Sequence, residues 1–383
     1  MICYKQNHLI KEYHNLSKED KINFKKQLKK IKYIKMYKLY KHSYKKMKIN
    51  IKEIKPLNVI KKSNKYKNIG IDLIKKGEYG VVIMAGGNGT RLGFNGPKGC
   101  LELNIDNKFI SLFELYIIQL KRIIDKYNIV IPIYIMTNTE NNNEIINYFE
   151  KKNYFNYPKN KIKFFKQSNL PILDVNGKII LKDEKNILFG PNGNGDIFKA
   201  LKKSKLIKDM MHNNLKYLLF VNVDNILNNL VDFDFIGTVI SQKYKLASKT
   251  IKINGAKEWI FCKYKNRPFM LPTEYLNNKL FDFKQNNEYI YRYKNISYYL
   301  ISISLIKKFT RVKIPYHRAY KKSKYLNSPN KPNSFKFEKF IFDAFYYSKD
   351  MLLYETDQAE FYPIKRISDI KGAIEMYKKN NQL

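Results

Sequence analysis

A glycine-rich segment with two cations offers the clearest chemistry in this sequence. It reads Ala85-Gly86-Gly87-Asn88-Gly89-Thr90-Arg91-Leu92-Gly93-Phe94-Asn95-Gly96-Pro97-Lys98 and directly follows an apolar run at 81–84. Glycines let the backbone approach a ligand closely, and successive amide N–H groups in such a turn form a concavity that binds anions. Because Arg91 and Lys98 add fixed positive charge, the segment suits a triphosphate.

Spacing excludes two other glycine-loop types for this segment. A P-loop needs lysine followed directly by serine or threonine, but Gly99 follows Lys98. The dinucleotide-binding fingerprint is G-x-G-x-x-G, whereas Gly87, Gly89 and Gly93 place the third glycine one residue too far along. We therefore interpret the segment as a phosphate-binding turn of another kind; a glycine turn without a ligand is the alternative.

A carboxylate after a second apolar run is the candidate metal ligand. Asp224 follows the apolar residues 217–223, and ligands of open α/β sheets bind beyond the carboxyl ends of the strands. A carboxylate there can hold Mg²⁺ between the protein and a phosphate. We predict that Asp224 binds Mg²⁺ or Mn²⁺; a simple strand-end cap is the alternative.

The elements that must position these residues follow an α/β pattern. We expect buried strands at 81–84, 131–136, 162–166 and 217–223, and helices at 111–127, 141–151 and 196–211. This alternation predicts a mostly parallel sheet with helices on both faces. After about residue 244 the pattern shifts to shorter strands and hairpins, such as 259–264, and residues 335–349 return to helix.

The first residues of the chain predict a helical region. Ser17 and Asp20 resemble a capping box, and one apolar stripe is expected along residues 22–39, formed by Ile22, Leu28, Ile31, Ile34 and Leu39. Residues 51–78 resemble a linker with a short helix. We predict an N-terminal helical region and linker at 1–75, a catalytic domain at 76–350 and a short C-terminal remnant at 351–383.

The formal charge of +40 raises the possibility of nucleic-acid or membrane-surface binding. Lysine, however, is spread through nearly every segment together with abundant asparagine, isoleucine and tyrosine, while arginine is scarce. Nucleic-acid readers favour arginine because its fork matches phosphates and guanine edges. We interpret the charge as a compositional bias, and expect no specific nucleic-acid partner; an excess of positive charge still attracts nucleotide and sugar phosphates.

Cysteine usage and the N-terminus predict a cytoplasmic protein with no membrane association. Cys3, Cys100 and Cys262 stand far apart, which suggests neither a disulfide framework nor a zinc site. The first residues lack the apolar region of a signal peptide. No apolar run approaches the roughly 18 residues of a membrane span.

The glycine-rich segment resembles the signature loop of UDP-N-acetylhexosamine pyrophosphorylases. Its AGG-x-GTRLG wording resembles this branch more than the UDP-glucose branch of the same superfamily, which more usually reads NGG-x-GT-x-MG. The resemblance implies a Rossmann-like, GT-A-like nucleotidyltransferase fold with a mixed, mostly parallel sheet flanked by helices. It also implies that the nucleotide contacts Ala85, Gly86, Gly87, Gly89 and Thr90.

Further matches follow in the same order, over roughly residues 8–366. Gln167 stands where the family's glutamine reads the uracil edge, and Asp224 matches the aspartate of the family's VDN segment. The PNGNG run at 191–195 resembles the family's GNG loop, in which Gly193 would approach the nucleotide and Asn194 the acetamido group. The remaining resemblances imply that Glu274 and Asn295 bind the sugar and that Lys336, before EKFIFD, reaches the phosphates from the far side of the cleft.

Three departures from the family pattern bear on activity. Asp196 replaces the second glycine after GNG, and a carboxylate beside a nucleotide could repel phosphate. Where the family has Asn-Ala-Gly-Asn, residues 292–295 read Arg-Tyr-Lys-Asn, so only Asn295 survives. The chain ends at Leu383, whereas eukaryotic relatives continue into a further C-terminal domain.

The resemblance implies a uridylyltransferase that converts UTP and N-acetylglucosamine 1-phosphate to UDP-N-acetylglucosamine and pyrophosphate. The sugar phosphate would attack the α-phosphorus in line, with Arg91, Lys98 and Lys336 as catalytic cations. A UDP-glucose or broad UDP-sugar pyrophosphorylase and a catalytically degenerate, nucleotide-binding paralogue are alternatives, and a basic RNA-binding protein is a third.

Overall fold

The computed structural model describes residues 6–42, 49–253, 259–272, 282–327 and 330–381. The chain divides into two compact units, each built from separate stretches of sequence. The smaller unit comprises Met1–Lys48, Gln167–Asp196 and Lys313–Ile341, and the larger unit comprises Ile49–Lys166, Ile197–Val312 and Phe342–Leu383. These boundaries do not coincide with the linear segments 1–75, 76–350 and 351–383 expected from the sequence.

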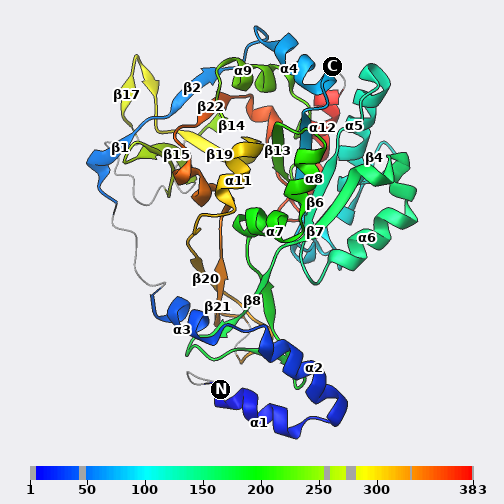
Figure 1. Cartoon of the computed structure of the whole chain (residues 1–383), viewed down its shortest axis with the longest axis vertical. Coiled ribbons are helices and arrows are strands. Elements are labelled where there is room, and N and C mark those ends of the chain that lie inside the picture. Colours follow the sequence, from blue (N-terminus) through cyan, green and yellow to red (C-terminus); the bar gives the residue numbers. More distant parts are fainter. Residues whose placement is uncertain (1–5, 43–48, 254–258, 273–281, 328–329, 382–383) are drawn as a thin grey trace. The chain divides into compact units, whose positions relative to one another are not determined.

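The larger unit is built on a mixed, mostly parallel sheet, as predicted. Within the described ranges it has 11 strands, with the main order β2-β22-β14-β19-β13-β3-β6-β7 (Figure 1). β13, β3, β6 and β7 run parallel, whereas β19 is antiparallel to β13 and β14. The strands of this path are β2 (Asn58–Lys61), β3 (Tyr79–Met84), β6 (Ile133–Thr137), β7 (Ile162–Lys166), β13 (Tyr217–Asn222), β14 (Leu246–Lys252), β19 (Tyr293–Ser302) and β22 (Leu352–Glu355).

Helices connect and cover these strands. Ser111 caps the helix between β3 and β6 by accepting a hydrogen bond from the Glu114 amide, and Asn128 ends it in the left-handed conformation. The predicted helix at 196–211 is instead two helices, because Lys205 between them also has positive φ. The helices of this unit are α4 (Lys67–Lys75), α5 (Leu112–Tyr127), α6 (Asn142–Lys151), α7 (Ile197–Lys203), α8 (Leu206–His212), α9 (Phe233–Ser241), α11 (Ile303–Phe309) and α12 (Asp369–Asn381). Of the helices in the described ranges, none has the length and apolar character needed to cross a membrane.

Two segments that the sequence placed outside the catalytic domain belong to the larger unit's sheet. The expected linker contributes β2, and the expected C-terminal remnant contributes β22, which pairs in parallel with both β2 and β14. Ile364 and Ala373, farther along, are buried in the main core. These strands are short, so hydrophobic periodicity gave little sign of them.

The smaller unit combines helices with small antiparallel sheets. The described N-terminal region forms α1 (Asn7–Asn15), α2 (Lys18–Lys29) and α3 (Tyr33–His42), and Ser17 caps α2 through the Asp20 amide as predicted. The expected apolar stripe is wrong, because the helix breaks after Lys29. Ile22 and Ile34 are 58% and 60% exposed. The helices instead bury Leu9, Phe24, Ile31 and Met36 in the core of this unit.

The predicted helix at 335–349 is also wrong. Residues Ser334–Glu338 form strand β21, which pairs with β20 (His317–Lys321) and β9 (Leu173–Asp174), and a 3-10 turn follows at Ile341–Tyr347. The alternation is strand-like, since Phe335 and Phe337 are buried while Lys336 and Glu338 are partly exposed. Two further strands of this unit, β8 (Asn169–Pro171) and β12 (Phe189–Pro191), form an antiparallel pair.

Candidate nucleotide-binding site

The glycine-rich loop and Asp224 emerge at one edge of the larger unit's sheet. β3 lies between β13 and β6, with Met84 in register with Asn222 and Met136. Because the three strands are parallel, the residues that follow them gather at the same carboxyl edge. The fold therefore brings together the two segments that the sequence predicts to bind phosphate and metal.

Backbone hydrogen bonds close the glycine-rich loop on itself. The Gly89 amide donates to the Gly96 carbonyl at 2.8 Å, and the Lys98 amide donates to the Gly87 carbonyl at 3.1 Å. Gly93 has a φ of 67°, which only glycine adopts without strain. A Cβ at Gly99 would lie 2.3 Å from the Phe113 ring, so this glycine lets the loop pack on helix α5. These contacts fix the loop before any ligand arrives.

Several groups of the loop remain available to a ligand. Among the described residues, the amides of Gly86, Gly87 and Asn88 have no hydrogen-bond acceptor. Arg91 is exposed and has no ion-pair partner in the same ranges. A Cβ on Gly87 would meet no atom within 4 Å, and Gly87 does not have positive φ. Neither packing nor backbone conformation thus requires glycine at 87, whereas close approach of a ligand would.

Two asparagines that the sequence reasoning missed hold the start of the loop. The Asn138 side chain donates to the Gly86 carbonyl at 2.8 Å, and the Asn141 side chain donates to the Ala85 carbonyl at 3.3 Å. Both are buried and follow β6. Asn138 is the second residue after the strand predicted at 131–136, so a search for polar residues within two positions of each predicted strand end would have found it.

Lys98 and Asp224 form an ion pair beside the loop. The Lys98 Nζ lies 3.2 Å from the Asp224 Oδ2, and the side chains are 10% and 20% exposed. The ammonium is therefore held directly beside the carboxylate predicted to bind a metal ion. The pair was not anticipated, although both residues were predicted separately.

The donor set at Asp224 suits a magnesium ion shared with substrate. Within the described residues, no three His, Cys, Asp or Glu side chains gather as a metal cluster. Mg²⁺ is commonly bound through one or two carboxylates, with substrate phosphates and water completing its shell. Asp224, at the same sheet edge as the loop amides, fits that arrangement.

Gln167 lies in the smaller unit, directly after the last residue of β7 in the chain. Its side chain is buried, and its Oε1 is a buried oxygen without a hydrogen-bond partner among the described residues. Such an atom is costly unless something satisfies it. A hydrogen-bond donor of a ligand would satisfy this oxygen.

The GNG loop of the smaller unit is built differently from the first loop. Gly193 has a φ of 85°, and a Cβ there would lie 2.4 Å from the Lys339 carbonyl oxygen. A Cβ on Gly195 would lie 2.6 Å from the Phe340 backbone. The Asn194 Oδ1 accepts a hydrogen bond from the Ile341 amide at 3.1 Å. Packing against residues 339–341 therefore explains both glycines.

Asp196 replaces a glycine of the family pattern, where a carboxylate could repel phosphate. In the structure, this carboxylate has partners inside the smaller unit. Its Oδ2 accepts hydrogen bonds from the Ser168 amide at 2.9 Å and the Ser168 hydroxyl at 2.6 Å, and its Oδ1 accepts one from Asn192 at 2.9 Å. The Lys339 Nζ lies 3.4 Å from Oδ1, and both side chains are 5% exposed. The carboxylate is thus neutralised inside the unit and ties the segment after Gln167 to the GNG loop.

Lys336 lies beside Gly190, at the end of the segment that leads into the GNG loop, and its ammonium is paired. Its Cε would lie 3.1 Å from a Cβ on Gly190. Its Nζ lies 2.8 Å from the Glu338 Oε1, which the sequence reasoning did not predict, and the two side chains are 23% and 24% exposed. Lys336 must therefore leave or share Glu338 to contact a phosphate.

Of the three residues predicted to bind the sugar, Asn194 is described above, and the structure describes Asn295 but not Glu274. The Asn295 Oδ1 accepts hydrogen bonds from the Ser297 amide at 2.9 Å and the Tyr299 hydroxyl at 2.8 Å, so this oxygen supports an irregular part of β19. Glu274 lies outside the described residues. In sum, the glycine-rich loop, Arg91, Lys98 and Asp224 share one edge of the larger unit, while Gln167, Gly193, Asn194 and Lys336 belong to the smaller unit.

Comparison with known proteins identifies consistent relatives. Residues 11–381 match the family described as UTP--glucose-1-phosphate uridylyltransferase. The chain is 35% identical, over 94% of its length and 81% of the relative, to a Dictyostelium discoideum protein named "Probable UDP-N-acetylglucosamine pyrophosphorylase". It is 34% identical to the Saccharomyces cerevisiae UDP-N-acetylglucosamine pyrophosphorylase, over 74% of this chain and 63% of that protein.

A solved structure supports the nucleotidyltransferase fold. The Trypanosoma brucei uridine diphosphate N-acetylglucosamine pyrophosphorylase, solved in complex with an inhibitor, matches with a TM-score of 0.81 and 23% identity. The match covers 97% of this chain and 82% of that one. At this identity the likeness concerns the fold alone, and it agrees with the sheet predicted from the sequence.

Proposed function

Because the chain belongs to the UTP–glucose-1-phosphate uridylyltransferase family, we propose that it transfers the uridylyl group of UTP to N-acetylglucosamine 1-phosphate. The products are UDP-N-acetylglucosamine and pyrophosphate. The two relatives described above are named for this sugar, which favours it over glucose within the family.

The observation that carries this proposal is the glycine-rich loop. Among the described residues, its amides at 86–88 have no hydrogen-bond acceptor, and the same loop carries the exposed Arg91 and the Asp224-paired Lys98. Preorganised N–H dipoles and cations stabilise phosphate charge without reorganising during the reaction. The loop is therefore the proposed site of the UTP phosphates.

The chemical step needs positioning more than proton transfer. An oxygen of the sugar phosphate attacks the α-phosphorus of UTP, and the bond from that phosphorus to the bridging oxygen breaks in line. Pyrophosphate leaves with the bonding electron pair. The nucleophile is already an anion, so the protein needs no general base. Lys98 and Arg91 neutralise the crowded α-phosphate and the leaving group, and holding both substrates in line lowers the entropic part of the barrier.

The remaining roles belong to the same proposal. Asp224 would hold Mg²⁺ or Mn²⁺, which when bound neutralises phosphate charge. Gln167 would pair with the uracil edge through its buried Oε1. Gly193 would approach the nucleotide, Asn194, Glu274 and Asn295 would bind the sugar, and Lys336 would neutralise the sugar phosphate. We further propose a cytoplasmic location, with which the buried free thiols Cys100 and Cys262 agree.

A pyrophosphate-release assay tests the proposal. The full chain is incubated with UTP and Mg²⁺ and with N-acetylglucosamine, N-acetylgalactosamine or glucose 1-phosphate in parallel. We expect the highest kcat/KM with N-acetylglucosamine 1-phosphate. Preference for glucose 1-phosphate would reassign the sugar, and UTP-dependent thermal stabilisation without pyrophosphate release would indicate a nucleotide-binding protein that does not catalyse the transfer.

A further inference from the structure

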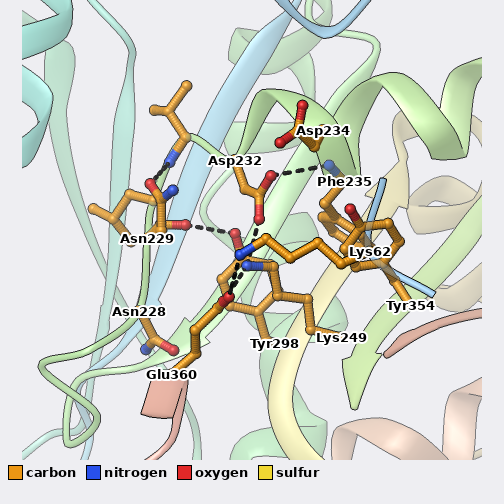
Figure 2. A network of polar contacts seen from close by, with 12 residues as sticks. Lys62, Asn228, Asn229, Asp232, Asp234, Phe235, Lys249, Tyr298, Tyr354 and Glu360 are labelled. Carbon is orange, nitrogen blue, oxygen red and sulfur yellow. Dashed lines mark hydrogen bonds and ion pairs between the residues drawn. The ribbon is translucent and has the colours of Figure 1, made fainter. Parts of the chain in front are cut away.

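Three charged side chains meet in the interior of the larger unit. Lys249, on β14, is 1% exposed, and its Nζ lies 2.5 Å from both the Asp232 Oδ2 and the Glu360 Oε2 (Figure 2). The ammonium also lies 4.9 Å from the centroid of the Tyr298 ring. Lys62 approaches the other oxygen of Glu360 at 3.1 Å and balances the second negative charge. We call Asp232, Lys249 and Glu360 the buried anchor.

Each member of the buried anchor comes from a different element. Lys249 is in the sheet, and Asp232 caps helix α9 by accepting a hydrogen bond from the Phe235 amide at 2.9 Å. Glu360 lies in the 3-10 turn Gln358–Glu360, after β22. Removing one partner from a buried ion pair is strongly unfavourable because an uncompensated charge remains. The anchor therefore fixes the position of the Glu360 backbone against the sheet.

The segment that Glu360 fixes is hydrogen-bonded to the turn that presents Asp224. The Asn225 side chain donates to the Glu360 carbonyl at 3.0 Å and accepts from the Tyr362 amide at 3.1 Å. The Ile364 amide donates to the Asp224 carbonyl at 2.8 Å. Three hydrogen bonds thus join residues 360–364 to Asp224 and its neighbour.

The opposite side of the same turn is held by a tyrosine. The Tyr116 hydroxyl lies 3.0 Å from the Asn222 carbonyl and 2.7 Å from the Asn225 carbonyl, and the Asn228 side chain donates to that hydroxyl at 2.9 Å. With this side fixed by helix α5, the 360–364 segment is the second support of the turn. The Asp224 carboxylate itself contacts Lys98.

We propose that Glu360 is a positioning residue for uridylyl transfer, acting through the buried anchor to hold Asp224 in place for the metal-bound phosphates. This inference rests on the proposed function, because it needs Asp224 to bind the metal. Glu360 itself touches no substrate. Displacing a supporting segment by about 1 Å can lower a rate a hundredfold, so loss of the anchor should act on turnover and on metal use.

The test compares Glu360→Gln with Glu355→Gln in the full chain. Both changes remove one carboxylate charge at similar shape. Glu355 pairs with Lys252 at 3.5 Å and accepts a hydrogen bond from the Tyr293 hydroxyl, and among the described residues it has no ion pair or hydrogen bond with residues 222–228. The variants are assayed well below their melting temperatures. For Glu360→Gln we expect kcat to fall about tenfold to a hundredfold, and the Mg²⁺ concentration for half-maximal rate to rise. For Glu355→Gln we expect neither change.

A second readout requires no turnover. Hydrogen–deuterium exchange of the Tyr362 and Ile364 amides should be faster in Glu360→Gln than in wild type, and unchanged in Glu355→Gln. Glu360→Asp, which keeps the charge, should recover part of both the protection and the rate, and it replaces Glu360→Gln if that variant does not fold.

Two results would overturn the proposal. One is unchanged exchange at these amides in Glu360→Gln. The other is faster exchange with wild-type kcat and Mg²⁺ dependence, which would leave the anchor a purely stabilising feature. A wild-type protein that releases no pyrophosphate with any sugar phosphate would instead refute the proposed function, while the exchange result would still test the mechanical link.

Discussion

The two glycine loops of this protein have similar composition but opposite construction. In the first loop, a Cβ on Gly87 would point into open space, and three consecutive amides have no acceptor among the residues that the structure describes. In the GNG loop, Gly193 and Gly195 are in contact with the backbone of residues 339–340. In the first loop, Gly93 and Gly99 serve the backbone conformation and the packing of the loop, but neither explains Gly87. In the GNG loop, packing explains both glycines.

The ion pair beside each loop differs in how many partners its carboxylate has. Lys98 is buried and Asp224 is 20% exposed, and the two share one contact at 3.2 Å. Lys339 and Asp196 are 5% exposed, and the Asp196 carboxylate accepts three further hydrogen bonds. A pair that can exchange partners suits phosphate chemistry, while a closed, fully bonded pair holds a loop in shape. Sequence motifs alone do not distinguish these two uses.

Removing the buried Lys339–Asp196 ion pair should produce the largest effect, a loss of folding stability. Lys339→Met leaves the buried Asp196 carboxylate without its cation, which is expected to lower the free energy of unfolding by about 3–5 kcal/mol. Urea unfolding measures the change, with Lys178→Met, an exposed lysine of the same unit, as the control. A loss below about 1 kcal/mol would show that the hydrogen bonds alone satisfy Asp196.

Removing the Lys98–Asp224 ion pair should lower the catalytic rate rather than the stability. Lys98→Ala removes a cation from the proposed phosphate site, and kcat should fall about 10²–10³-fold, by analogy with removal of one oxyanion-hole donor. The melting temperature should change little, because Asp224 reaches solvent. Steady-state kinetics and thermal unfolding check both parts, with the exposed Lys108→Ala as control. A wild-type rate would remove Lys98 from the mechanism.

Replacing Gly193 of the GNG loop tests whether packing requires a glycine there. Gly193→Ala forces a side chain into a left-handed backbone and toward the Lys339 carbonyl, so we expect a loss of about 2 kcal/mol or more in the free energy of unfolding. Denaturant unfolding provides the measurement. A variant as stable as wild type would mean that the loop relaxes away from residue 339 without cost.

Gly87→Ala should leave the stability unchanged and weaken the binding of UTP. Its methyl group meets no protein atom, so the free energy of unfolding should stay within about 0.5 kcal/mol of wild type. The KM for UTP should rise about tenfold if the phosphates approach this backbone, because one such factor corresponds to about 1.4 kcal/mol of lost contact. Unchanged KM and kcat would place the nucleotide elsewhere.

The smallest expected effect is a change with pH in the stability that Glu360 contributes. Burial acts to raise the pKa of Glu360, but the Lys249 ammonium outweighs it and lowers the pKa to about 2. A carboxyl with a depressed pKa contributes stability above its unfolded value, here 4.5, and loses it as pH falls toward 2. The stability difference between wild type and Glu360→Gln should therefore be smaller at pH 3 than at pH 6. A pH-independent difference would mean that the charge of Glu360 is not what the variant removes.

Local patterns in the sequence determined much of this protein. The apolar runs before glycine or aspartate predicted β3 and β13, and β7 begins and ends at the predicted residues. The prediction that residues 85–98 bind phosphate rests on residue types and spacing within one short segment. Such features need only neighbours in the chain, because strand burial and turn chemistry are local consequences of the side chains.

The tertiary structure decided what depends on distant partners. No local pattern indicated that Asp196 would meet Lys339, that Lys98 would meet Asp224, or that β2 and β22 would pair in the central sheet. The helix expected at 335–349 is wrong because residues 334–338 pair with β20 and β9, which are separate in the sequence. Whether a side chain is buried, and whether a charge is free or neutralised, is set by segments far apart in sequence, since only the folded chain brings their atoms within reach.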